Sequence, residues 1–195
     1  MHRANIGPTG CGKTYQALQE AKRAGKPVLF VNPKAEDIPG MVRLDGMADS
    51  ETLGRLLKKG LNVNYLPYRD RKIALKELDV VVQKAFEVQD VFIIFDEAEV
   101  HGYEGLSFSP LFDVAERGRS LGVEGLFLVQ DPAGVSKRIL RNCDQFRVFA
   151  FNEYSRQYFT RLGYDVAYMQ SLLLEKGKFS YIIIEGGEIK GVRRE

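Results

Sequence analysis

A glycine-rich turn near the start of the chain allows few folds. It reads Gly7-Pro8-Thr9-Gly10-Cys11-Gly12-Lys13-Thr14 and matches the pattern G-x-x-x-x-G-K-[ST] at every required position. Glycines let the backbone curl so that its N–H groups point inward, and a following helix adds the positive end of its dipole. The turn therefore predicts a phosphate-binding loop, with Lys13 on the β- and γ-phosphates and the Thr14 hydroxyl on Mg²⁺.

The rest of the chain alternates short apolar runs with stretches of helical spacing. We expect strands at 3–6, 28–31, 62–66, 91–95, 125–129 and 145–151, and helices at 13–24, 49–59, 69–88, 109–121 and 133–142. Continuous apolar strands that alternate with helices indicate an α/β fold, with a mostly parallel sheet covered on both faces. Two runs at 178–184 and 188–192, separated by Glu185-Gly186-Gly187, predict a C-terminal β-hairpin.

Length and composition are those of one ordinary globular domain. The chain has 195 residues, of which 45% are hydrophobic and 28% charged. We expect a single domain over 1–195, with a core at about 1–151 and a helical and hairpin extension at about 152–195. The net charge of +2 makes no case for nucleic acid by itself. No apolar run approaches the ~20 residues of a membrane span, and the two cysteines form no disulfide framework, so a cytoplasmic location is the simpler interpretation.

A second motif follows the run Val91 to Phe95. This apolar strand ends in Asp96-Glu97, which is the Walker B pattern. Asp96 is expected to hold the Mg²⁺ shell, and Glu97 to activate the attacking water as general base. An adjacent acid favours hydrolysis over phosphoryl transfer, because a kinase must exclude water. Glu99 is interpreted as a solvated loop acid.

Polar residues flank the strand predicted at 125–129. Gln130 ends this strand, which we expect to lie beside the Walker B strand, so that its amide reaches the γ-phosphate and the water. Arg117 and Arg119 precede the strand on an expected domain edge. An arginine there can enter a neighbouring subunit's site and neutralise charge in the transition state. The alternative is a surface helix end, where basic residues favour the dipole.

The segment from Arg119 to Asn142 resembles the HerA/FtsK superfamily of DNA-pumping ATPases. The shared features are an arginine before a strand, then Gly, the apolar strand, Gln and a Pro two residues later, here Arg119, Gly122, 126–129, Gln130 and Pro132. The run Asn32-Pro33-Lys34-Ala35-Glu36 is similar to that superfamily's Asp-Pro-Lys-Gly-Glu. Asn32 and Asp131 depart from the pattern and leave the subfamily open. The resemblance implies a RecA-like P-loop NTPase fold and covers most of the chain to about residue 150.

The resemblance implies an oligomeric ATPase that translocates double-stranded DNA, with ATP and Mg²⁺ as cofactors. Packaging of a viral genome into a preformed capsid is favoured over a Zot-like phage assembly ATPase, because members of that branch usually carry a membrane segment. The expected assembly is a homo-oligomeric pentamer or hexamer in the host cytoplasm, with capsid or portal-vertex proteins as further partners. A small P-loop kinase stays a third alternative. ATP is preferred over GTP because no Asn-Lys-x-Asp motif occurs.

Two basic groups and one loop are weaker signals. Lys137, Arg138 and Arg141 fall on one expected helix, and Arg69-Asp70-Arg71-Lys72 forms the other group. Either group suits the phosphates of DNA, and a solvated helix face explains both equally well. The glycine-punctuated, aromatic loop at 101–108 is either a mobile pore loop or an ordinary surface loop.

Overall fold

The computed structural model describes residues 1–46 and 50–194. Within them, one nine-stranded sheet runs in the order β3-β4-β2-β5-β6-β1-β7-β8-β9. The strands are β1 Arg3–Ile6, β2 Val28–Val31, β3 Val42–Asp45, β4 Val63–Leu66, β5 Phe92–Phe95, β6 Glu124–Val129, β7 Gln145–Val148, β8 Ser180–Glu185 and β9 Glu188–Arg194. The pairings from β3 to β7 are all parallel, which confirms the expected sheet.

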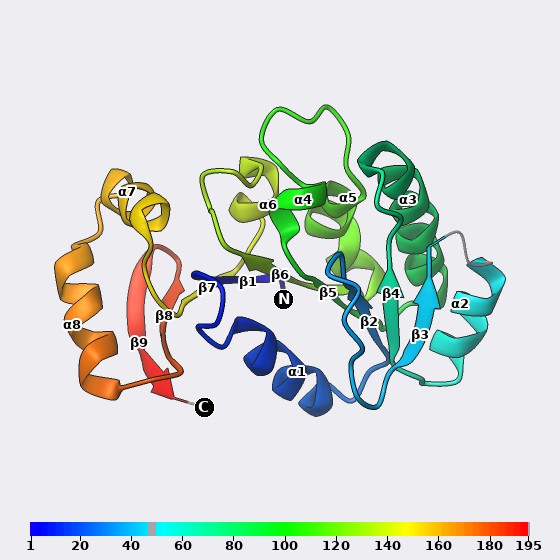
Figure 1. Cartoon of the computed structure of the whole chain (residues 1–195), viewed down its shortest axis with the longest axis horizontal. Helices are drawn as coiled ribbons and strands as arrows, with labels where there is room; N and C mark the ends of the chain where they lie inside the picture. Colours follow the sequence, from blue (N-terminus) through cyan, green and yellow to red (C-terminus); the bar gives the residue numbers. More distant parts are fainter. Residues whose placement is uncertain (47–49, 195) are drawn as a thin grey trace.

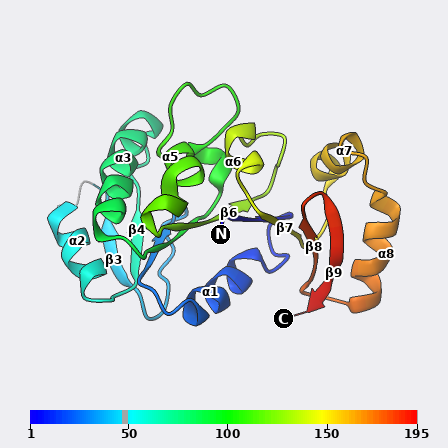
Figure 2. The same cartoon turned by 180° about the vertical axis from the view of Figure 1, so that it is seen from behind.

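Helices cover both faces of this sheet. They are α1 Lys13–Arg23, α2 Ser50–Lys58, α3 Arg71–Val88, α4 Ala98–His101, α5 Pro110–Arg117, the 3₁₀ turn η1 Gly118–Leu121, α6 Lys137–Arg141, α7 Glu153–Arg161 and α8 Val166–Lys176. The helix α1 lies on one side of the sheet, and α3, α5 and α6 lie on the other (Figures 1 and 2). The helices α7 and α8 lie at the end of the sheet formed by β8 and β9 (Figure 1).

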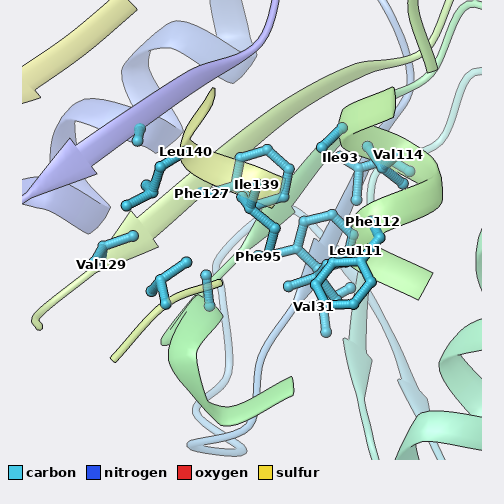
Figure 3. Packing of buried hydrophobic residues seen from close by; sticks show 14 of the residues in the cluster. Val31, Ile93, Phe95, Leu111, Phe112, Val114, Phe127, Val129, Ile139 and Leu140 are labelled. Carbon is cyan, nitrogen blue, oxygen red and sulfur yellow. The ribbon is translucent and has the colours of Figure 1, made fainter. Parts of the chain in front are cut away.

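The strands β2 and β5 are apolar at every position, because both faces of the sheet are covered there. Their side chains alternate between two layers. Phe30, Ile94 and Leu128 pack against Ala17 and Ala21 of α1. Residues one position along, among them Val31, Phe95 and Val129, join the larger cluster under the helices of the other face, which is drawn in Figure 3. This double burial fixes β5, β6 and β1 side by side, so their carboxyl ends meet at one edge of the sheet.

The chain end forms the predicted hairpin. β7 pairs with β8 and β8 with β9, both antiparallel. The two loop residues Gly186 and Gly187 both have positive φ, 58° and 81°, as a type I′ turn requires. The hairpin continues the same sheet, and α8 packs against both of its strands.

Several predicted bounds differ from the structure. The strand predicted at 145–151 ends at Val148, and the helix predicted at 133–142 covers only α6, because Ser136 caps it by accepting from the Arg138 N–H at 3.4 Å. The helix predicted at 109–121 divides into α5 and η1. The strand β3 was not predicted, since it is a mostly exposed edge strand of mixed polarity. Asp49, predicted in a helix, lies outside the described residues.

Among the residues that the structure describes, no helix combines the length and the apolarity that crossing a membrane requires.

Candidate active site

The glycine-rich turn forms a tight loop between β1 and α1. Gly12 has a φ of 102°, and a Cβ atom there would lie 3.0 Å from a ring carbon of Phe179. A Cβ atom at Gly7 would lie 2.8 Å from the Cys11 sulfur. Both positions therefore require glycine. Among the residues that the structure describes, no side chain caps α1, so its first N–H groups are available to bind an anion.

Lys13 folds back over this loop. Its Nζ donates to the carbonyl oxygens of Gly7 at 2.6 Å and Pro8 at 2.9 Å. The side chain is buried, and this burial lowers the pKa of Lys13 from its ordinary value. A lysine ammonium held at a glycine-rich loop, just before the start of a helix, brings positive charge to the place where that loop and helix can bind a polyphosphate. Thr14, the predicted Mg²⁺ ligand, is the next residue of α1 and is partly exposed.

The two acids of the Walker B motif lie at the carboxyl end of β5. Asp96 is only 5% exposed, and its Oδ1 accepts the N–H of Glu97 at 3.1 Å. Glu97 has a φ of 47°, in the left-handed region. A non-glycine residue held there costs about 1–3 kcal/mol, and such strain clusters at functional sites. The turn at Glu97 separates the two carboxylates, so that one is buried and the other is partly open to solvent.

The sequence predicts no role for Lys34, but the structure places it against both acids. Its Nζ lies 3.0 Å from Asp96 Oδ2 and 3.4 Å from Glu97 Oε1. Burial alone would lower the pKa of Lys34, but the hydrogen bond and charge of Asp96, with those of Glu97, raise it. The available signal was topological: Lys34 follows β2, and β2 pairs with β5, so the turn after β2 lies beside the Walker B acids.

Gln130 connects the two motifs, as its place after β6 predicts. β6 lies between β5 and β1. The Gln130 Nε2 donates to Glu97 Oε1 at 2.8 Å, and its Oε1 accepts from the Thr9 hydroxyl at 3.1 Å. One amide thus spans from the phosphate loop to the second Walker B acid.

The interpretation of Glu99 as a solvated acid is wrong. Its Oε1 accepts the N–H of Gln130 at 3.1 Å, while its Oε2 is buried and has no hydrogen-bond partner in the described part of the chain. Burial raises the pKa of the Glu99 carboxyl. Glu99 lies in the first turn of α4, and the sequence could not show that α4 folds back under the end of β6. The hydrogen bond from the Gln130 N–H indicates that the Glu99 carboxyl holds the backbone of Gln130 in position.

Two candidate arginines lie at the opposite edge of the sheet. Arg119 precedes β6, whereas Gln130 follows it, and a six-residue strand spans about 20 Å. Arg119 is 51% exposed and pairs with Asp144 at 2.8 Å. Arg117 is 59% exposed, 4.0 Å from Asp113. The structure therefore does not bring either arginine to the Glu97 of its own chain.

No family model matches the sequence, and no curated protein does. Solved structures do resemble the chain. The genome packaging NTPase B204 from Sulfolobus turreted icosahedral virus 2, in complex with ATP-gammaS, matches with a TM-score of 0.75 at 12% identity, over 99% of this chain and 96% of that one. VirB4 of Thermoanaerobacter pseudethanolicus matches with a TM-score of 0.66 at 12% identity, over 100% of this chain and 89% of that one.

The chain shares the P-loop α/β fold of these solved structures, with a mostly parallel sheet covered by helices.

In this P-loop fold the side chains suit both implied cofactors. For a nucleotide, the fit rests on the uncapped start of α1 and on the Lys13 ammonium, whose partners are loop carbonyls that a triphosphate can replace. For Mg²⁺, the fit rests on oxygen donors, since the Asp96 carboxylate and the Thr14 hydroxyl are the hard ligands this ion prefers. The Lys34 ammonium already brings positive charge to the Asp96 carboxylate, which indicates that this carboxylate is built to face a cation.

Proposed function

We propose that this chain is an ATP-hydrolysing motor that works as a homo-oligomeric ring and moves double-stranded DNA. The observation that carries the hydrolytic part is the meeting of Lys13, Glu97 and Gln130 at one edge of the sheet. The fold neighbours support ATP as the nucleotide, because B204 was crystallised with ATP-gammaS and with AMPPCP.

Each group at this edge has a role in hydrolysis. The loop N–H groups and Lys13 bind and orient the phosphates, and Thr14 with Asp96 would hold Mg²⁺, which supplies charge neutralisation to the γ-phosphate. Glu97 Oε1 takes a proton from the attacking water as general base. Gln130 already donates to that oxygen and accepts from Thr9 of the loop, so it fixes the angle between water and phosphate.

The position of the arginines supports a ring. Arg117 and Arg119 stand at the amino edge of the sheet, about 20 Å from their own site, with exposed side chains. In a ring, the amino edge of one subunit is placed against the carboxyl edge of the next, so an arginine completes the neighbour's site in trans. Arg119 then exchanges Asp144 for the neighbour's γ-phosphate. A pentamer or a hexamer has this geometry.

DNA is the proposed cargo because both basic groups adjoin the loop at 101–108. The Arg71 guanidinium lies 4.6 Å from the ring centre of Tyr103, and the Lys137 N–H donates to Glu104 at 3.0 Å. This loop extends from the helical face in Figure 1 and directly follows the Walker B helix α4. Arg69, just before α3, and Arg141, at the end of α6, are both exposed. A nucleotide-dependent movement of Glu97 would therefore pass only through α4 before it reaches this loop and the basic groups beside it.

The similarity to B204 suggests a biological setting, since B204 is the DNA-packaging ATPase of Sulfolobus turreted icosahedral virus. We extend that setting to this chain as packaging of a viral genome into a preformed capsid, in the host cytoplasm, with capsid or portal-vertex proteins as partners. This setting is consistent with the chain and B204 matching over nearly their full lengths.

The test measures ATP turnover with and without double-stranded DNA across a salt series. We expect stimulation at low salt that falls steeply as salt rises, because phosphate contacts release counterions. The double variant Arg69→Ala/Arg141→Ala should lose stimulation and keep the basal rate. The control variant Lys58→Ala/Lys59→Ala removes equal charge at the end of α2 and should respond like the wild type. A wild-type rate indifferent to DNA in an assembled ring would favour a protein-moving assembly ATPase or a kinase.

A further inference from the structure

A cavity of about 620 Å³ lies beside the phosphate loop, on the side away from Glu97. The loop contributes Gly10 and Cys11 to its wall. The other lining residues come from the chain after β7 and from the C-terminal extension, and the apolar ones are Phe149, Ala150, Phe151, Leu173, Leu174 and Phe179. Its volume falls within the range of about 300–1,000 Å³ that is common for small-molecule sites.

The strand order places this cavity on the opposite side of the phosphate loop from Glu97 and Gln130. β5 and β6, which carry Glu97 and Gln130, lie on one side of β1, and β7 and β8 lie on the other. Phe149 donates its N–H to Ile6 at 2.9 Å, so the chain leaves the sheet directly beside the loop. A nucleotide with its γ-phosphate at Glu97 and its other phosphates along the loop would place its base on the β7 side of the loop, where this cavity lies.

Phe179 is held at the mouth of the cavity in a strained conformation. Its φ is 63°, in the left-handed region that disfavours a bulky side chain. The next residue maintains the turn, since the Ser180 hydroxyl donates to Gly177 at 2.7 Å or Leu173 at 3.1 Å. The ring lies against Gly12 of the loop, yet the residue is 53% exposed. Strain that keeps an aromatic ring partly in solvent, beside a phosphate loop, indicates a ligand for that ring.

We propose that this cavity binds the purine base of the nucleotide, with the base stacked on Phe179 and its other edge against Phe149 and Phe151. The proposal rests on the proposed function and adds that the C-terminal extension, through Phe179, forms half of the nucleotide site. A purine fits because its flat aromatic face matches an exposed phenyl ring, and stacking of a base on such a ring contributes about 1–3 kcal/mol. The cavity is continuous with the phosphate loop, which commits it to the same ligand.

The test compares two ligands that share the phosphates and differ in the base. Binding of Mg–ATP and of Mg–tripolyphosphate is measured by calorimetry on the full chain. The variant Phe179→Gly removes the ring and suits the positive φ, so it should fold at least as well as the wild type. Phe179→Tyr keeps an aromatic ring. The control Tyr168→Ala removes an equally exposed aromatic residue, also 53%, from α8 outside the cavity.

We expect Phe179→Gly to raise the Kd for Mg–ATP about tenfold, the effect of about 1.4 kcal/mol, and to leave the Kd for tripolyphosphate unchanged. Phe179→Tyr and Tyr168→Ala should bind both ligands like the wild type. The fluorescence of 2-aminopurine riboside triphosphate should be quenched when it binds the wild type and should stay high when it binds Phe179→Gly. The chain has no tryptophan, so this signal has little background.

Two results would overturn the base site while leaving an ATPase in place. An unchanged Kd for ATP in Phe179→Gly would mean that the cavity receives something else, such as a segment of a second copy. Equal weakening of both ligands would mean that Phe179 only shapes the phosphate loop. Wild-type protein that binds neither ligand would instead remove the proposed function, and the base site with it.

Discussion

Gln130 and Glu97 are joined by a hydrogen bond of 2.8 Å, from Gln130 Nε2 to Glu97 Oε1, across the ends of neighbouring strands. Only one of the two groups can act as a base. Glu97 Oε1 accepts this hydrogen bond and also lies 3.4 Å from the Lys34 ammonium, so the carboxylate is held in one orientation. In the proposed function, this pair is the part of the site where water is oriented and deprotonated.

Glu97→Gln should bind ATP with near wild-type affinity and lose turnover by about 10²–10⁴-fold, the usual contribution of a general base. The amide keeps the shape of the side chain, and Asp96 still serves the metal. Nucleotide binding and steady-state hydrolysis check this. Glu87→Gln, on an exposed part of α3, is the control and should match the wild type. Complete loss of ATP binding in Glu97→Gln would mean that Glu97 is structural.

Lys34→Met should destabilise the nucleotide-free protein, because Asp96 is almost fully buried and loses the cation 3.0 Å away. An uncompensated charge costs about 2 kcal/mol, or about 4–8 °C in Tm for a domain of this size. The loss should shrink when Mg–ATP is added, since the metal replaces the missing charge. Thermal unfolding with and without Mg–ATP measures it.

Lys84→Met is the matched control for Lys34. Lys84 pairs with Glu51 and Glu87, whose side chains are 70% and 61% exposed. Removing it leaves no buried charge, and exposed pairs contribute little, so its Tm should hardly change. Equal Tm losses in the two variants, insensitive to Mg–ATP, would show that Lys34 has no special relation to the site.

Arg119→Ala should keep ATP binding, because the site of its own chain is intact, and lose turnover by about 10³-fold or more. Mixing it with Glu97→Gln should restore part of the activity, since one interface in the mixture joins an intact Glu97 to an intact Arg119. Native mass measurement must show both variants in one ring. Mixed rings that recover no ATP turnover would count against an arginine that acts in the neighbouring subunit. Full activity of a dilute wild-type monomer would rule that arrangement out. Arg117→Ala, tested in parallel, decides which arginine acts.

Much of this site could be predicted because its chemistry is local in sequence. Gly7 to Thr14 is one turn between two elements, and Asp96-Glu97 ends one strand, so spacing alone predicts both. Gln130 needed one further step, the expectation that its strand lies beside the Walker B strand, and the pairing of β5 with β6 confirms that expectation.

The remaining features depend on contacts between distant segments. Lys34 meets Asp96 across 62 positions, and Phe179 meets Gly12 only once α8 and β8 have packed beside β7. Glu99 is buried by the fold of α4, whereas its sequence neighbours are those of a surface loop. The strand β3 alternates apolar and polar residues over only four positions, Val42 to Asp45, and its side chains are mostly exposed, so its local pattern is too short to mark a strand.

The central claim is that the loop around Lys13 binds and positions ATP for hydrolysis, and its most direct measurement is steady-state ATP turnover by purified protein with Mg²⁺. The wild type should hydrolyse ATP, and Lys13→Ala should bind it weakly and turn over almost none, because the loop loses the ammonium held at Gly7 and Pro8. Turnover by Lys13→Ala at the wild-type rate, in a preparation free of other ATPases, would contradict the account.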